Sequence, residues 1–408
     1  MRLLICAGGT GGGVYPALSI LQALQASKDP GPAASQPASW SGEQPSLERA
    51  AQQAVQQHGV LPLGEQDAVL WVGGAGGMEA DLVKREGVRF EAIPAGQVHG
   101  VSLRALPGNL WQLGRGFLAA RRILRKFRPD VLLFTGGYLA VPMAFAARLL
   151  RQGKSLLFVP DIEPGWALKT LARFADQIAL SVEDSCAFFS SHPNVKVTGY
   201  PLRPGLAALS TSQARSLFAL RDDLPVLLVM GGSKGSHSIN QALQTVLPEL
   251  LKQVQVIHLS GNLEWALVER SRKGLPVELQ ARYRPYPYLH NEMGAALQAA
   301  DLVVSRAGAS TLGEYPLFGL PAILVPYPYA WRYQRVNAKY LEKHGAAILL
   351  DDQDLPAQLL PAVLELLSDR EKRQAMRAAS SALAQPQAAL QLAALIQDLA
   401  PDSNRVRH

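Results

Sequence analysis

The chain has 408 residues, of which 48% are hydrophobic and 18% charged. This composition favours a soluble globular protein with large buried sheets, and the length suits two domains of ordinary size. No apolar run reaches the ~18 residues that cross a bilayer, so the sequence predicts no membrane-spanning helix. A formal net charge of +7 indicates an anionic partner, for which nucleic acid, acidic lipid and a phosphorylated metabolite are all candidates.

The chain opens with a short apolar strand at residues 3–5 that leads directly into a glycine-rich loop, so we expect no signal peptide and a cytosolic protein. Five glycines and Thr10 fill residues 8–13, before a helical run expected at 16–24. Glycine lets the backbone approach a ligand closely, and the N–H groups at a helix N-terminus attract negative charge. The loop therefore predicts an anion site, with an ordinary tight turn as the alternative. Its spacing matches neither the dinucleotide fingerprint nor the P-loop.

A second loop of this kind follows residues 226–230, a continuous apolar run typical of a buried parallel strand. It spans residues 231–236 and is followed by a helix that we expect from Ile239. Two such strand–loop–helix units in one chain predict two doubly wound α/β domains.

Strand and helix signals alternate along the rest of the chain, which favours parallel sheets. Residues 28–66 interrupt the alternation with Pro, Ser, Gln and Ala, and we expect a mobile surface insertion there. The first half is expected to hold further strands at 68–72, 90–93, 131–134, 155–159, 177–180 and 195–198. The second half is expected to hold strands at 226–230, 254–259, 302–305, 322–325 and 347–349.

The turn-rich residues 199–205 form the expected hinge. They separate an N-terminal domain at 1–198 from a C-terminal domain at 199–375, and we expect the helical tail at 376–408 to pack back on the N-terminal domain. Ligands of doubly wound sheets bind beyond the carboxyl ends of the strands. We therefore expect the features that follow strand ends to converge on one cleft between the domains: the glycine loops, Tyr138, Asp161, Arg203 and residues 306–314.

Four motifs occur in a characteristic order: Gly8-Gly9-Thr10-Gly11-Gly12, Thr135-Gly136-Gly137-Tyr138, Gly231-Gly232-Ser233-Lys234-Gly235 and Arg306-Ala307-Gly308-Ala309-Ser310-Thr311-Leu312-Gly313-Glu314. With them the chain resembles the peptidoglycan lipid-intermediate N-acetylglucosaminyltransferases, the MurG-like members of glycosyltransferase family 28. The resemblance covers nearly the whole chain outside residues 28–66. It implies a GT-B fold, in which two Rossmann-like domains face an interdomain cleft. It also implies an inverting transfer of GlcNAc from UDP-GlcNAc to the 4-hydroxyl of the MurNAc unit of undecaprenyl-pyrophosphoryl-MurNAc-pentapeptide, which converts lipid I to lipid II.

The resemblance further implies that the second domain binds the donor. Glu314 should accept hydrogen bonds from the ribose hydroxyls, Gly232 and Ser233 should bind the diphosphate, and Arg203 should contact the nucleotide charge. The main chain near Leu289 should bind the edge of the uracil, and Gln334 should bind the GlcNAc hydroxyls. The remaining donor-binding candidates are Ala309, Ser310, Thr311, Leu312 and Gly313. Three alternatives stay open: a hinge-side surface ion for Arg203, a surface helix position for Gln334 and a helix-dipole role for Glu314.

On the acceptor side, the resemblance places the diphosphate and the reacting centre near Thr10, Gly11, Gly12, Gly13 and Tyr138. The family has His where this chain has Gly13, and Asn where it has Asp161. A carboxylate that is partly desolvated at a strand end suits a general base, so we expect Asp161 to take the acceptor proton, with Glu163 second. Capping of a helix that begins near Pro164 is the alternative for Asp161. His99 is a further candidate on an acceptor-side loop, where a lone histidine is more often a bystander.

The sequence predicts no cofactor and no obligatory metal ion, because no D-x-D motif follows a strand and Asp351-Asp352 reads as a pair of solvated caps. The donor-side loop and helix end can stabilise the departing diphosphate electrostatically. Apolar and basic residues alternate over residues 101–128, which suits a peripheral contact with an anionic membrane, unless the apolar face is simply core. The resemblance thus implies a bacterial enzyme on the cytoplasmic face of the cell membrane, with UDP-GlcNAc and an undecaprenyl-linked acceptor as partners.

Two other function classes remain. The missing His at position 13 fits a UDP-sugar-binding paralogue without transferase activity, and a GT-B transferase with another glycolipid acceptor would carry the same donor motifs. An epimerase would need several catalytic acids and a His in the cleft, which we do not find. Nucleic-acid binding is disfavoured because the basic residues cluster beside apolar ones.

Overall fold

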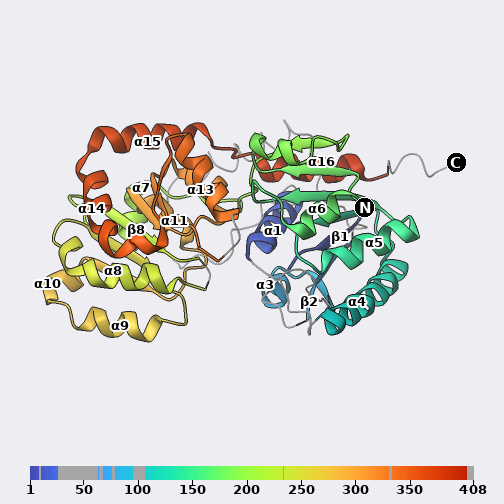
Figure 1. The fold of residues 1–408 in the computed structure, drawn as a ribbon, viewed down its shortest axis with the longest axis horizontal. Helices are drawn as coiled ribbons and strands as arrows, with labels where there is room; N and C mark the ends of the chain where they lie inside the picture. The colour runs from blue at the N-terminus through green and yellow to red at the C-terminus, as the bar shows by residue number, and fades with distance from the viewer. Residues whose placement is uncertain are drawn as a thin grey trace, which may run out of the picture. The chain divides into compact units, whose positions relative to one another are not determined.

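The structure is a computed structural model that describes residues 1–8, 11–25, 63, 68–75, 79–94, 106–232, 234–329 and 333–401. The chain forms two compact units, Met1–Pro204 together with Pro386–His408, and Gly205–Gln385 (Figure 1). Apart from Leu63, the insertion expected at 28–66 lies outside the described residues.

The described part of the first unit contains a seven-stranded parallel sheet in the order β3-β2-β1-β4-β5-β6-β7. Its strands are β1 (Arg2–Cys6), β2 (Ala68–Gly74), β3 (Arg89–Ile93), β4 (Val131–Phe134), β5 (Lys154–Val159), β6 (Gln177–Leu180) and β7 (Val195–Val197). Its helices are α1 (Gly11–Gln25), α3 (Glu79–Arg85), α4 (Leu106–Phe127), α5 (Ala140–Leu150), α6 (Trp166–Ala172) and α16 (Ala388–Leu399), with the 3-10 helix η1 (Glu183–Phe188).

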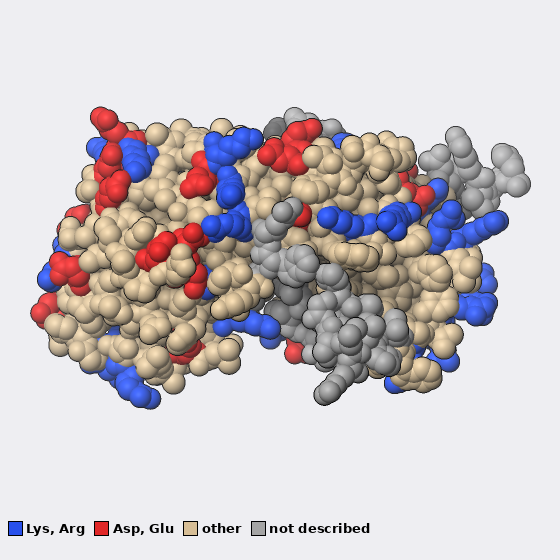
Figure 2. Space-filling view, viewed as in Figure 1, with Lys and Arg blue, Asp and Glu red and all other residues tan. Residues whose placement is uncertain are grey.

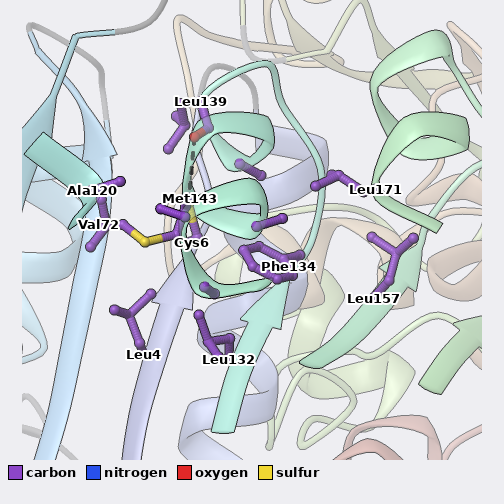
Figure 3. Packing of buried hydrophobic residues seen from close by; sticks show 14 of the residues in the cluster. Leu4, Cys6, Val72, Ala120, Leu132, Phe134, Leu139, Met143, Leu157 and Leu171 are labelled. Atoms are coloured by element: carbon purple, nitrogen blue, oxygen red, sulfur yellow. Dashed lines mark hydrogen bonds between the residues drawn. The ribbon is translucent and has the colours of Figure 1, made fainter. Parts of the chain in front are cut away.

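Both faces of this sheet are buried, which explains why its strands read as continuous apolar runs. On one face, alternate strand residues such as Leu4, Leu132 and Leu157 pack with α4 and α5 in a single core cluster (Figure 3). The Cys6 thiol lies in this cluster 4.0 Å from the carbonyl oxygen of Leu139, and burial raises its pKa. The C-terminal helix α16 packs against α1 and contacts β4 and β5, so the last helix of the chain completes the first unit (Figure 1).

The described part of the second unit contains a six-stranded parallel sheet in the order β10-β9-β8-β11-β12-β13. Its strands are β8 (Val226–Met230), β9 (Gln255–Leu259), β10 (Tyr283–Tyr286), β11 (Leu302–Ser305), β12 (Ala322–Leu324) and β13 (Ala347–Leu349). Its helices are α7 (Thr211–Leu217), α8 (His237–Leu250), α9 (Trp265–Lys273), α10 (Val277–Gln280), α11 (Met293–Ala299), α12 (Thr311–Phe318), α13 (Tyr333–Lys343), α14 (Leu355–Ser368) and α15 (Arg370–Ala382), with the 3-10 helix η2 (Asp352–Asp354). Helices α8 and α14 share the core on one face, while α12 packs against α15.

The expected strands all form, within one or two residues of their expected ends. Three expectations about the elements were wrong. Helix α1 begins at Gly11 rather than Pro16, so part of the first glycine-rich loop belongs to the helix, and α8 begins at His237 rather than Ile239, directly after the second loop. Strand β10 was missed because Pro285 interrupts its pattern. Proline is tolerated there because β10 is an edge strand.

Candidate functional site

The carboxyl ends of β1 and β4 lie side by side in the first unit, where the strand order reverses direction. Such a switch point is where doubly wound sheets bind ligands. The loops that follow these two strands touch, because the Thr135 hydroxyl donates to the Gly13 carbonyl oxygen at 2.6 Å. Gly137 has a φ of +92°, and a Cβ there would lie 3.0 Å from the Gly8 carbonyl oxygen, so a larger residue would separate the two loops.

The glycines expected on the acceptor side open α1: Gly11, Gly12 and Gly13 are its first three residues. A Cβ at Gly13 would lie 3.3 Å from the Thr135 carbonyl oxygen, so a histidine here would start against the loop that follows β4. Tyr138 is half-buried in that loop. Thr10 and His99 lie outside the described residues.

The two candidate bases follow β5, the strand next to β4. Asp161 is half-buried and Glu163 is buried. Helix α6 begins at Trp166, and its N-cap is Gly165, which has no side chain to cap it. The alternative that Asp161 is the N-cap of this helix is therefore wrong, because the helix begins too far along the chain.

Arg203 belongs to the first unit, although we expected it to serve the nucleotide. Its guanidinium carbon lies 5.6 Å from the ring centroid of Tyr15, which is on α1 two positions after Gly13. A guanidinium over an aromatic face is attracted to the ring and loses mobility. The cation is thereby held close to the first glycine loop.

The second unit repeats the switch point between β8 and β11. The glycine loop after β8 needs its glycines: a Cβ at Gly231 would lie 2.2 Å from the Ser236 nitrogen. Gly232 is exposed with a φ of +87°, and Gly235 has a φ of +80°. Ser233 lies outside the described residues. The described part of the loop thus places main-chain atoms without side chains at the start of α8, and the N–H groups of a helix N-terminus suit a phosphate group.

The segment after β11 leads into α12. Glu314 lies half-buried in the first turn of this helix, so its carboxylate is placed both for a ligand hydroxyl and for the helix dipole. The preceding turn is fixed by the Thr311 hydroxyl, which donates to the Gly308 carbonyl oxygen at 2.7 Å. The buried Asn337 amide donates to the Ala307 carbonyl oxygen at 3.2 Å. Ser310 is half-buried, and the other candidates of this segment are buried: Ala309, Leu312 and Gly313.

Sequence reasoning missed a polar network at the same sheet edge. The Arg306 guanidinium pairs with the Asp352 carboxylate and donates to the Ser238 hydroxyl at 2.8 Å. Asp351 pairs with Arg335 of α13. The expectation of a solvated cap was wrong for Asp352, which holds the largely buried Arg306, whereas Asp351 occupies the N-cap position of η2 and stays partly exposed. The available signal was Arg306 itself, a cation placed directly after a buried strand.

The two remaining donor candidates are placed as follows. Leu289 is buried just after β10. The Gln334 side-chain oxygen accepts a hydrogen bond from the Tyr327 backbone N–H at 2.8 Å. This bond uses the oxygen, so the side-chain N–H groups of Gln334 can donate to another group. Within the described residues, no group of three or more His, Cys, Asp or Glu side chains is placed to hold a metal ion.

Comparison with known proteins decides the family. The Glycosyltransferase family 28 N-terminal domain matches residues 61–180, and the Glycosyltransferase family 28 C-terminal domain matches residues 226–392. A UDP-N-acetylglucosamine–N-acetylmuramyl-(pentapeptide) pyrophosphoryl-undecaprenol N-acetylglucosamine transferase of Roseiflexus sp. (strain RS-1) is 39% identical over 98% of this chain and 95% of its own length. The chain belongs to glycosyltransferase family 28. A transferase of the same name from Desulforamulus reducens is 34% identical over 98% of this chain and 99% of its own length.

Solved structures agree on the fold. MurG of Acinetobacter baumannii superposes with a TM-score of 0.67 at 24% identity, covering 97% of this chain and 99% of that chain. The calicheamicin glycosyltransferase CalG4 superposes with a TM-score of 0.64 at 15% identity and covers both chains fully. The family 28 chain is thus a glycosyltransferase with the GT-B fold, as its motifs predicted.

Proposed function

We propose that this glycosyltransferase moves GlcNAc from UDP-GlcNAc to the 4-hydroxyl of the MurNAc unit of undecaprenyl-pyrophosphoryl-MurNAc-pentapeptide, the conversion of lipid I to lipid II in peptidoglycan synthesis. The observation that carries the proposal is the 39% identity, over 95% of its length, to a transferase of that name. The glycine loops at the two switch points support it, because each presents backbone N–H groups to a diphosphate.

In the proposed donor site, Gly232, Ser233 and the N-terminus of α8 hold the diphosphate of UDP-GlcNAc and stabilise it as it departs. Glu314 accepts hydrogen bonds from the ribose hydroxyls. The main chain near Leu289 contacts the uracil, and Gln334 donates to the sugar through the amide group that its bond to Tyr327 leaves available. Arg203 remains a candidate for a contact with the negative charge of a diphosphate.

In the proposed acceptor site, the diphosphate of the lipid lies against Thr10 and the glycines that open α1. Asp161 takes the proton of the attacking hydroxyl, and Glu163 is the second candidate for this role. A positioned general base contributes typically ~10²–10⁴-fold to the rate. This assignment follows from Gly13, because a residue without a side chain cannot carry the proton that the family histidine would handle. His99 remains a further candidate on the acceptor side.

The lipid acceptor requires contact with a membrane, and we assign that contact to α4 and α5 of the first unit. Trp111 and Leu118 of α4 are 71% and 62% exposed, and Phe145 and Leu149 of α5 are 50% and 61% exposed. The second half of α4 does pack into the core, through Ile123, Leu124 and Phe127. The helix therefore serves both purposes: one stretch is core and another presents large apolar side chains at the surface.

Basic side chains are exposed on the same helix as Trp111 and Leu118, which suits anionic lipid. Arg122, Arg125 and Lys126 of α4 are exposed, and Figure 2 shows Lys and Arg side chains along the part of the first unit that carries α4 and α5. A cavity of about 480 Å³ adjoins α5, with four cationic side chains in its lining: Arg148, Arg151, Lys154 and Arg173. None of the helices that the structure describes combines the length and apolar content that crossing a bilayer demands. We propose peripheral attachment on the cytoplasmic side.

A transfer assay tests the proposal. The wild type is incubated with UDP-GlcNAc and a short-chain lipid I analogue, with and without EDTA, and the disaccharide lipid is quantified. We expect product in both conditions. Asp161→Asn should lower kcat by ~10²-fold or more with donor affinity retained, whereas Asp222→Asn, an exposed carboxylate of the second unit, should have no effect. A wild type that binds UDP-GlcNAc but transfers nothing to this acceptor would overturn the proposal in favour of a sugar-nucleotide-binding paralogue or another acceptor.

A further inference from the structure

We propose, on the basis of the proposed function, that Glu79 binds the sugar part of the acceptor at the first glycine loop, where its carboxylate accepts a hydrogen bond from a hydroxyl or amide N–H group of that sugar. Glu79 is the first residue of α3, the helix that follows β2. Strand β2 pairs with β1, so Glu79 lies at the sheet edge where the first glycine loop begins. A single Glu at the start of a helix is an ordinary feature, and no motif marked it in the sequence.

The Glu79 carboxylate fits between two glycines at the ends of β1 and β2. A Cβ at Gly8 would lie 2.3 Å from Oε1 of Glu79, and a Cβ at Gly73 would lie 2.9 Å from its Cγ. Both distances are shorter than van der Waals contact, so these two positions have room for the carboxylate only because they lack side chains. The absence of a side chain at Gly8 is therefore explained by Glu79 as well as by the anion site.

One carboxylate oxygen is bonded and the other is not. Oε1 accepts a hydrogen bond from the Gly74 backbone N–H at 2.8 Å. The residue is 0% exposed, and Oε2 has no hydrogen-bond partner among the described residues. A buried acceptor without a partner costs ~1–3 kcal/mol, and more when charged. Native proteins keep few such groups, and each calls for a partner or a role that explains it.

The chemistry of the group selects the kind of ligand. The oxygens of a carboxylate accept hydrogen bonds, and a carboxylate lacks the N–H donors that bind phosphate. The N-terminus of α1, at the other end of the same loop, attracts phosphate. The two ends of the loop therefore suit different parts of one acceptor: the diphosphate at Gly11–Gly13, and the hydroxyl or amide donors of its sugar at Oε2 of Glu79.

The test compares Glu79→Gln with Asp81→Asn. Glutamine keeps the shape and the acceptor toward Gly74 but places an N–H donor where Oε2 was. Asp81 is an exposed carboxylate on the same helix and serves as the matched control. We expect Glu79→Gln to raise the KM for the lipid I analogue roughly tenfold or more, while the KM for UDP-GlcNAc and the melting temperature stay at the wild-type values. Asp81→Asn should change none of the three.

A second variant tests the geometry. Gly8→Ala introduces the Cβ that would displace the carboxylate, so it should weaken acceptor binding selectively as well. Because both changes remove one interaction, the double variant Gly8→Ala, Glu79→Gln should be no weaker in acceptor binding than the weaker single variant.

Two results overturn the inference. One is an unchanged acceptor KM in Glu79→Gln. The other is an equal loss toward both substrates with a lowered melting temperature, which would make Glu79 a packing residue of the loop. Failure of the proposed function looks different, since the wild type itself would then not transfer GlcNAc. In that case the thermal shift that the lipid I analogue induces in wild type and in Glu79→Gln still measures whether Glu79 binds it.

Discussion

Arg306 and Asp352 form an ion pair that joins the end of β11 to the loop before α14, across 46 positions of sequence. Arg306 also stacks over the Tyr327 ring at 5.2 Å and donates to the Val325 carbonyl oxygen at 3.2 Å. The Arg306 guanidinium also donates to the Ser238 hydroxyl at the start of α8. It therefore connects three segments: the start of α8, the segment that leads to Glu314, and the loop after β12. The proposed donor site is built from these three pieces, so Arg306 sets their spacing.

The first prediction concerns this ion pair. Arg306→Met should raise the KM for UDP-GlcNAc roughly tenfold, which corresponds to ~1.4 kcal/mol, with little change in the KM for the acceptor. The reason is that the Arg306 side chain is only 9% exposed, so its loss removes the cation that compensates Asp352 and leaves that carboxylate with the Ser238 hydroxyl as donor. Steady-state kinetics with each substrate varied in turn give both constants. Arg221→Met breaks an exposed pair with Asp223 and is the control. Equal effects of the two variants would contradict the prediction.

The second prediction concerns the glycine loop after β8. Gly235→Ala places a Cβ 2.2 Å from the Ser260 carbonyl oxygen at a φ of +80°, so it should destabilise the second unit and abolish UDP-GlcNAc binding. Gly205→Ala is matched in backbone conformation, with a φ of +75° and no atom within 4 Å of the added Cβ. It should cost only the ~1–2 kcal/mol of the left-handed conformation. Differential scanning calorimetry and donor titration separate the two, and similar behaviour of both variants would argue against a close-packed loop.

The third prediction is a pH dependence of stability from His258. Its ring is fully buried, with Nδ1 2.7 Å from the Tyr283 hydroxyl and Nε2 3.0 Å from Oδ1 of Asn240. The Asn240 amide nitrogen donates to the Ser260 carbonyl oxygen, so its Oδ1 accepts and Nε2 of His258 carries the proton. Burial lowers the pKa of His258 from 6.5 to about 3.

Because this pKa is lowered by folding, the unfolded chain binds the proton first as the pH falls. The stabilisation from neutral His258 is therefore complete above pH ~6.5 and declines by up to ~1.4 kcal/mol per pH unit below it. Hydrogen exchange of the β9 amides between pH 7.5 and 5 measures the slope. His258→Gln should flatten it, and His290→Gln, an exposed histidine, should leave it unchanged. Asp176, whose pKa is also lowered, contributes in the same direction only below about pH 4.

The fourth prediction concerns the membrane contact. The double variant Trp111→Ser, Leu118→Ser should lose binding to phosphatidylglycerol vesicles in a flotation assay, because burying large apolar side chains in the interface stabilises attachment. Turnover of a water-soluble acceptor analogue should be unchanged. Leu263→Ser removes a side chain that is 87% exposed in the second unit and should leave flotation intact. If the double variant still floats with the vesicles, the contact lies elsewhere on the chain.

The sequence by itself determined the strands, the positions of the glycine loops and the family. Buried parallel strands appear in a sequence as continuous apolar runs. A strand such as 131–134 can therefore be recognised without knowing which strands lie beside it. The loops are visible locally as well, since each is a run of glycines directly after an apolar strand. The start of α1 was misjudged because Pro16 was taken as its first residue, and the edge strand β10 was missed because Pro285 interrupts its pattern.

The tertiary structure alone decided which polar side chains meet. Glu79 fills the space left by Gly8, Arg203 lies over Tyr15, and Asp352 holds Arg306, although each pair is far apart in the sequence. Parallel strands bring all their carboxyl ends to one edge, so the residues after different strands become neighbours there. Which of these residues pair depends on the strand order and on the space left where glycines lack a side chain. Neither can be deduced from the local pattern of apolar and polar residues.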